Sequence, residues 1–276
     1  MKRFVCLLAL LLAVVLAFSA CVGDAVQSGT SVDSAVSEES TEISLGTESS
    51  EPDISLPSED ETSEVEYPEG AYIIKSFTAA DSVEWENVPK ADISIYKWVD
   101  SVEYEAYAQL VYITGYGFLC RMTCMESDPP AQYTQFGDPV YLDSCMEFFA
   151  AWDNKSYINL ECNSIGTLCA QFGRTKANRK SATDFLPLEQ MFVATPVVKE
   201  NYWELTIDIP IEKLQSFYGN AISAETFVSG YSFKGNFYKI GSDPETGVRH
   251  YGMWNEVNTK TPDFHQPNYF GTLVIE

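Results

Sequence analysis

The residues best suited to contact a ligand lie near the C-terminal end of the chain, from Gly235 to Glu276. This stretch sets large aromatic side chains among Gly, Pro, Asn and Asp, a composition typical of surface loops rather than of a helix. A flat Trp or Tyr ring stacks on the apolar face of a sugar, and Asn, Glu, Lys and Arg side chains hydrogen-bond its hydroxyls. Trp254 is the candidate platform, and the alternative is that it closes one end of the fold. The aromatic residues are Phe237, Tyr238, Tyr251, Trp254, Phe264, Tyr269 and Phe270.

Common catalytic motifs are absent from the sequence. It contains no GxSxG, HExxH, P-loop or glycine-rich dinucleotide turn, and its two histidines, His250 and His265, are not spaced as metal ligands. Glycoside hydrolysis would need two carboxylates, and these would come from distant strands. Single Glu residues on strands are mostly solvated or hydrogen-bonded. We therefore predict that the protein is not an enzyme.

Two other functions compete with sugar binding. A haem-binding redox domain would use Met and His as axial ligands, although histidines in loops beside Gly and Pro favour a structural role. An adhesion or scaffold protein would use the same aromatic loops to contact another protein. The residues available as haem ligands are Met122, Met125, Met146, Met253, His250 and His265.

Residues 1–20 have the pattern of an export signal. Lys2 and Arg3 precede an apolar run, Phe4 to Ala17, which is shorter than the roughly 20 residues that span a membrane. The sequence FSAC at 18–21 resembles the bacterial lipobox, in which the cysteine becomes the lipidated first residue. We expect a protein anchored through Cys21 to the outer face of the cytoplasmic membrane and facing the cell surface. An ordinary secretory signal is the alternative.

Residues 21–66 are predicted to be a disordered tether. From Val22 to Glu66 there are thirteen acidic residues, no Lys or Arg and no aromatic residue. Such a segment buries too little apolar area to offset its conformational entropy.

The net charge of the whole chain is −23, and an acidic surface without basic clusters argues against nucleic acid or anionic headgroups as partners.

From Tyr67 onward the hydrophobic pattern is mostly that of β-strands. Polar Glu204, Thr206 and Asp208 alternate with apolar residues, which predicts one buried and one wet face. Short strands with close turn signals predict an antiparallel β-sandwich, jelly-roll or immunoglobulin-like, in one domain over residues 67–276. One short helix is expected at Ile211–Phe217, ended by Gly219. The predicted strands are Ala71–Phe77, Ala106–Ile113, Phe118–Cys124, Tyr157–Asn163, Gly166–Phe172, Tyr202–Pro210 and Thr272–Glu276.

The cysteines of this domain are odd in number and cannot all form disulfides with one another. They lie in apolar runs without a CxxC motif, which argues against a metal cluster and favours small buried side chains. The five residues are Cys120, Cys124, Cys145, Cys162 and Cys169.

Several short motifs, in their order and spacing, resemble the family 9 carbohydrate-binding modules, in particular family-9-like domains of bacterial lipoproteins. The resemblance covers nearly all of residues 67–276. The motifs are DSCMEFF at 143–149, YINLECN at 157–163, GTL at 166–168, WE at 203–204, IP at 209–210 with Leu214, GNFYK at 235–239, Trp254, PDFH at 262–265 and FG at 270–271.

The resemblance implies a β-sandwich that binds reducing ends of plant-type oligo- or polysaccharides between two aromatic rings, without catalysis. Tyr141 and Trp254 match the two rings. Glu147 matches a strand glutamate that accepts hydrogen bonds from sugar hydroxyls. Asn236 and Lys239 match the polar end of a later strand.

The sequence departs from the family pattern at two points. Tyr141 stands where Trp is common, and the arginine that family members carry on a central strand has no clear counterpart, Arg174 and Arg179 being nearby candidates. Structural calcium is the one cofactor that the resemblance implies. No set of oxygen ligands for it can be assembled from the sequence.

Overall fold

The computed structural model describes residues 66–276. The predicted export signal, Cys21 and the tether up to residue 65 lie outside the described residues. The described residues belong to one unit of the fold. Between residues 66 and 276, no helix has the length and apolar character needed to cross a membrane.

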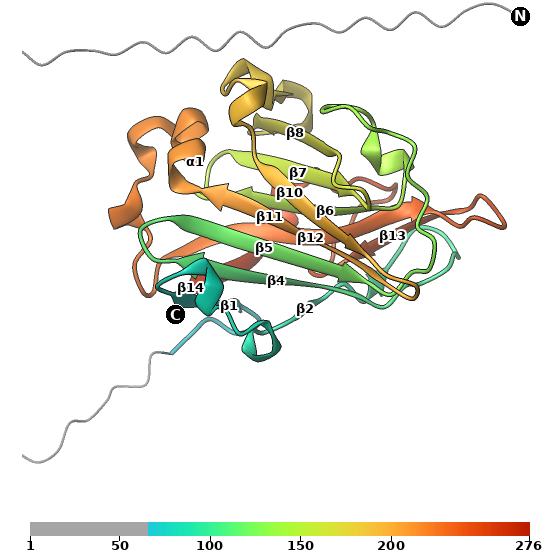
Figure 1. Ribbon diagram of the computed structural model, residues 1–276, viewed down its shortest axis with the longest axis horizontal. Coiled ribbons are helices and arrows are strands. Elements are labelled where there is room, and N and C mark those ends of the chain that lie inside the picture. Colours follow the sequence, from blue (N-terminus) through green and yellow to red (C-terminus); the bar gives the residue numbers. More distant parts are fainter. Residues whose placement is uncertain (1–65) are drawn as a thin grey trace, which may run out of the picture. The chain divides into compact units, whose positions relative to one another are not determined.

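Two β-sheets are stacked face to face, and strand β1 (Tyr72–Phe77) pairs with both (Figure 1). Sheet A continues from β1 in the order β14–β12–β6–β7–β8–β9, with β13 beside β12 and β3 beside β13. Sheet B has the order β10–β11–β5–β4–β1, with β2 beside β4. Sheet A contains β3 (Ile95–Tyr96), β6 (Cys145–Ala151), β7 (Tyr157–Asn163), β8 (Leu168–Gly173), β9 (Lys180–Ser181), β12 (Ser232–Ser242), β13 (Arg249–Met253) and β14 (Gly271–Ile275). Sheet B contains β2 (Ala91–Asp92), β4 (Ala106–Ile113), β5 (Gly117–Cys124), β10 (Val193–Val198) and β11 (Trp203–Pro210).

The sandwich is mixed, which corrects the prediction of an antiparallel fold. Strand β1 runs parallel to β14 through Tyr72–Ile74 and parallel to β4 through Lys75–Phe77. All other strand pairs are antiparallel. The hydrophobic period of a strand reports which face is buried and carries no information about the direction of its neighbour. For this reason the sequence pattern predicted the strands but not the parallel pairs.

Strand β11 confirms the predicted alternation. Trp203, Leu205, Ile207 and Ile209 are buried, and the polar residues between them are partly exposed. The chain then forms α1 (Ile211–Tyr218), which lies at one end of the sandwich (Figure 1). Short 3-10 helices join the strands at Ala80–Ser82, Trp85–Asn87, Val140–Leu142, Lys176–Asn178, Ala182–Asp184, Leu188–Gln190, Gly219–Ala221, Ala224–Thr226 and Pro267–Tyr269.

Sheet A is covered on both faces, which explains its continuous apolar runs. In β6, Met146 and Phe148 point into the core between the two sheets. Cys145 and Phe149 point the other way, into a second cluster formed with residues from the loops over the outer face. Polar residues on this outer face of sheet A are therefore reached only where the covering loops leave an opening.

The five cysteines are free, and four are buried. Burial raises the pKa of the Cys124 thiol to about 12, so it stays protonated at neutral pH. The four buried cysteines thus act as small buried side chains, as expected, whereas Cys169 is partly exposed.

Candidate ligand-binding site

A pocket of about 700 Å³ opens on the outer face of sheet A. Its floor comes from three neighbouring strands, with Glu147 on β6, Glu161 on β7 and Gln171 on β8. Strand β12 adds Ile240. The remaining lining residues are Gly137, Pro139, Tyr141, Leu142, Cys169, Lys176, Arg179, Arg249, Tyr251, Pro262, Asp263, Phe264 and His265.

One wall is the loop that ends in the 3-10 helix Val140–Leu142. The buried Asp143 carboxylate accepts hydrogen bonds at 3.1 Å from the backbone of Gln132 and Tyr133, and at 2.8 Å from Asn163. This anchor presents Tyr141 with 42% of its surface exposed. The predicted ring at position 141 is therefore available at the pocket.

The PDFH segment at 262–265 also lines the pocket. Phe264 stacks on Tyr238 with ring centroids 4.1 Å apart, and His265 stacks on Phe149 at 4.8 Å. Lys176 forms an ion pair with Asp263 at 2.9 Å, which joins this segment to the loop after β8. Burial lowers the pKa of His265 to about 3, so its ring is neutral at physiological pH.

Two arginines reach the pocket from outside the central strands. Arg179 donates to the Asn159 side chain at 2.9 Å, and Arg249 on β13 donates to the backbone carbonyl of Tyr141 at 2.6 Å. Arg179 was one of the two arginines considered from the sequence, whereas Arg249 was missed. The signal for Arg249 was its spacing of two from Tyr251, which places both side chains on one face of a strand.

Glu147 and Glu161 lie directly opposite each other on β6 and β7. They are only 3% and 5% exposed. Burial and then the neighbouring Glu161 charge raise the pKa of Glu147 well above its usual range, against Arg249 and Arg179. Burial raises the pKa of Glu161 to about 7, against Arg179 and a hydrogen bond from Asn159. Glu161 was missed, although its spacing of two from Asn159 in YINLECN placed it on a polar face.

The stability of the ligand-free protein should depend on pH through Glu161. Folding raises the pKa of Glu161 from an ordinary 4.5 to about 7. The stability that Glu161 contributes is therefore fully present below pH 4.5 and is lost as the pH rises through 7. Between about pH 5 and 8, the free energy of unfolding of the natural protein should fall by about 2–3 kcal/mol more than that of the Glu161→Gln variant. Urea unfolding of both proteins across this range tests the prediction, and parallel curves would contradict it.

Trp254 does not face Tyr141, which corrects the predicted arrangement of two rings across a gap. Trp254 follows β13, and its ring packs on the side of sheet A that faces sheet B. It meets Tyr72 edge-on at 6.2 Å and Phe237 at 5.7 Å. A methyl group on Gly271 would collide with the indole. Trp254 therefore packs as a partly buried side chain of the fold.

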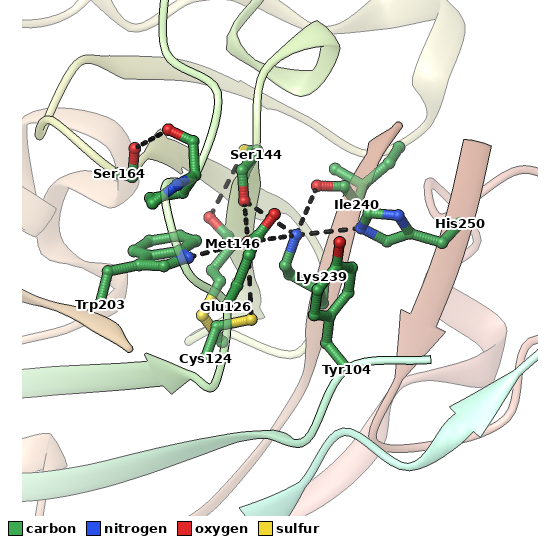
Figure 2. A network of polar contacts seen from close by, with 12 residues as sticks. Tyr104, Cys124, Glu126, Ser144, Met146, Ser164, Trp203, Lys239, Ile240 and His250 are labelled. Atoms are coloured by element: carbon green, nitrogen blue, oxygen red, sulfur yellow. Dashed lines mark hydrogen bonds and ion pairs between the residues drawn. The ribbon is translucent and has the colours of Figure 1, made fainter. Parts of the chain in front are cut away.

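Lys239 lies in a buried polar network on the core side of sheet A (Figure 2). Its ammonium donates to the Ser144 hydroxyl at 2.9 Å and forms an ion pair with Glu126 at 3.3 Å. The Nε2 atom of His250 is 3.0 Å away, and Trp203 donates to Glu126 at 2.9 Å. Lys239 is fully buried and does not line the pocket.

Asn236 is also buried away from the pocket opening. Its side chain donates to the backbone carbonyl of Asn255 at 2.7 Å and accepts from the Asn255 amide at 2.9 Å. These bonds hold the chain just after Trp254. Of the five predicted sugar-contacting residues, the pocket brings together Tyr141 and Glu147 and leaves out Asn236, Lys239 and Trp254.

The residues considered as haem or metal ligands are dispersed in the described part of the chain. His250 lies in the Lys239 network and His265 at the pocket, so they face opposite sides of sheet A. Met122 and Met146 are packed in the core. In residues 66–276, no three His, Cys, Asp or Glu side chains cluster as metal ligands would. Structural calcium, which backbone and amide oxygens also bind, stays a prediction of the family resemblance.

Comparison with known proteins gives the family and the fold. The model of carbohydrate-binding family 9 matches residues 78–275. A candidate carbohydrate-binding protein from Bacteroides uniformis is 23% identical, with a TM-score of 0.60 over 75% of this chain and 99% of that one. No protein with a curated function matches the chain.

Solved family 9 modules from Caldicellulosiruptor kristjanssonii share the fold as well. The module in complex with cellotriose is 11% identical, with a TM-score of 0.51 over 75% of this chain and 93% of that one. The module in complex with glucose is 10% identical, with a TM-score of 0.50 over 74% and 95%. At this identity the likeness supports the sandwich architecture alone.

Proposed function

Because the chain belongs to carbohydrate-binding family 9, we propose that the pocket on sheet A binds an oligosaccharide without transforming it. One observation carries the proposal: the exposed ring of Tyr141 borders a pocket whose floor holds the carboxyl group of Glu147. No described side chain or backbone amide donates a hydrogen bond to that carboxyl. A ligand with an apolar face and a rim of donors would satisfy both groups.

The other lining residues suit the same ligand. Gln171 and Arg179 reach the floor with amide and guanidinium donors, and Tyr251 adds a second ring beside Arg249. We extend the proposal to the end of a glycan, including the reducing end that the family resemblance implies. The ligands of the two Caldicellulosiruptor modules, cellotriose and glucose, are the natural first probes.

The placement of the two glutamates supports binding over hydrolysis. Glycosidases set their carboxyl groups on opposite sides of the scissile bond. Glu147 and Glu161 instead lie side by side as cross-strand neighbours on one floor. The side-by-side glutamates thus support a non-catalytic role. The export pattern of residues 1–20 and the cysteine at position 21 support a lipid-anchored protein that binds glycans at the cell surface.

Calorimetric titration with cellotriose and glucose tests the proposal. We expect exothermic binding in the micromolar to millimolar range, about −4 to −8 kcal/mol. Absence of heat with these sugars and with xylo-oligosaccharides would contradict it.

Tyr141→Ala should weaken cellotriose binding about tenfold, because the variant removes the exposed stacking ring. Tyr116→Ala is the matched control, since Tyr116 is 43% exposed and lies outside the pocket. The control should bind as the natural protein does. Equal affinities for the two variants would remove Tyr141 from the site.

A further inference from the structure

The two glutamates on the pocket floor are the acidic groups of the site that lack a paired cation. Asp263, the third acid in the lining, already pairs with Lys176 at 2.9 Å. Glu147 has no ion-pair partner among the described residues. For Glu161 the nearest cationic candidate is His265, with its Nε2 atom 3.9 Å from the carboxyl oxygen. The His265 ring is neutral near pH 7, so this contact supplies no charge.

The cations in the lining are held by other groups. Arg179 donates to Asn159 and to the Lys176 backbone carbonyl, and Arg249 donates to the Tyr141 carbonyl. Neither guanidinium forms an ion pair with the floor. They lower the pKa of Glu147 through space but leave its oxygens without a donor. Cys169, the remaining titratable group of the floor, has a thiol whose pKa burial raises to about 12.

Two buried carboxyl groups directly opposite each other repel when both are charged. The arrangement is stable when a proton or a cation lies between them. A sugar hydroxyl can donate to such a pair but brings no positive charge. An ammonium group brings both the charge and three donors, and it is small enough for a floor set by neighbouring strands.

We propose that Glu147 and Glu161 form an ammonium subsite, and that the pocket takes a glycan with a free amino group on the sugar at its floor. The inference rests on the proposed function and narrows it from glycans in general to amino sugars. Tyr141 stacks on the ring of that sugar, and the carboxyl pair holds its amino group. The N-acetylated form of the same sugar has lost the charge and should not be favoured.

Three β-1,4-linked trisaccharides give a matched test with the full chain. Cellotriose, the glucosamine trimer and the N-acetylglucosamine trimer differ in the group at carbon 2. At about pH 6, below the ordinary pKa of an amine, the glucosamine trimer should bind about tenfold more tightly than cellotriose. Glu161→Gln should reduce this preference to about twofold or less, and Glu189→Gln, at an exposed position outside the pocket, should retain it.

A second readout does not depend on any variant. The free carboxyl pair holds a proton near neutral pH, because burial raises both pKa values and the neighbouring Glu161 charge raises that of Glu147 further. An ammonium group would displace that proton, so calorimetry in two buffers of different ionisation enthalpy should detect proton release with the glucosamine trimer.

The possible outcomes distinguish the ammonium subsite from the proposed function, glycan binding. Equal affinity for the glucosamine trimer and cellotriose, or preference for the N-acetylated trimer, would overturn the ammonium subsite and leave glycan binding intact. Failure of all three sugars to bind would overturn both.

Discussion

Replacing Lys239 with Met should lower the free energy of unfolding by about 3–5 kcal/mol, because it leaves the buried carboxylate of Glu126 without its counter-charge. The loss should be measured by urea unfolding followed by tryptophan fluorescence, since Trp203 donates a hydrogen bond to the same carboxylate. Lys234→Met is the control on the same strand. Lys234 is exposed and donates to Thr272, so its replacement should change stability by about 0.5 kcal/mol or less.

A double variant separates the charge from the packing. In Lys239→Met with Glu126→Gln, no unpaired charge remains, and the amide can still accept from Trp203 and Ser144. The double variant should therefore be more stable than Lys239→Met alone, which makes the coupling free energy of the two sites favourable. Strict additivity of the two single effects, or a loss as small as that of Lys234→Met, would contradict the role of this ion pair.

The Lys239 network also lies behind the pocket on sheet A. Ser144 is three residues from both Tyr141 and Glu147, and His250 stands between Arg249 and Tyr251 on β13. The network thus joins the core side of the strands whose other side forms the pocket. A buried polar cluster here fixes the mutual position of these strands, because each bond has its own required geometry.

Much of the fold could be predicted from the sequence because strands that are buried on one face show it. Trp203 to Ile209 alternate strictly, and the helix of α1 ends at a glycine with positive φ, as turn chemistry requires. The apolar pattern of a strand does not report the direction of its neighbours, so the parallel pairing of β1 with β14 and β4 was missed. Strand β10 was also missed, since Pro196 breaks its pattern and such a proline is tolerated on an edge strand.

The site was harder to predict, because sheet A is buried on both faces. In the run Asn236 to Ile240 every residue is buried, so the apolar pattern gives no sign of which side each residue faces. The register decides it. Tyr238 lies opposite Glu147, and Lys239 lies opposite Met146, which places Lys239 on the face away from the pocket. This register joins segments about ninety residues apart and cannot be derived from either one.

The position of Glu161 in the site also depends on the strand register. Its alternation with Asn159 and Asn163 marked a polar face, but only the pairing of β6 with β7 places it opposite Glu147. The resemblance to a known family supplied Glu147 and not its partner. The carboxyl pair is therefore a property of the folded chain that neither strand shows alone.

Trp254→Ala should lower the free energy of unfolding by about 3 kcal/mol, because the indole packs against Tyr72 and Phe237 on the core side of sheet A. The cellotriose affinity of the folded protein should stay the same, since Trp254 does not line the pocket. Thermal unfolding and calorimetry on one preparation measure the two quantities. The prediction thus separates a packing ring from a stacking ring.

Gly271→Ala tests the packing of the Trp254 ring by adding a methyl group next to it. The added methyl group would overlap the six-membered ring of Trp254, and overpacking of this kind costs about 1–3 kcal/mol. In combination with Trp254→Ala the added methyl group has room, so the double variant should lose less than the sum of the two single losses. If Trp254→Ala instead abolished cellotriose binding while leaving stability unchanged, the ring would belong to the site and the assignment of the pocket to the outer face of sheet A would fail.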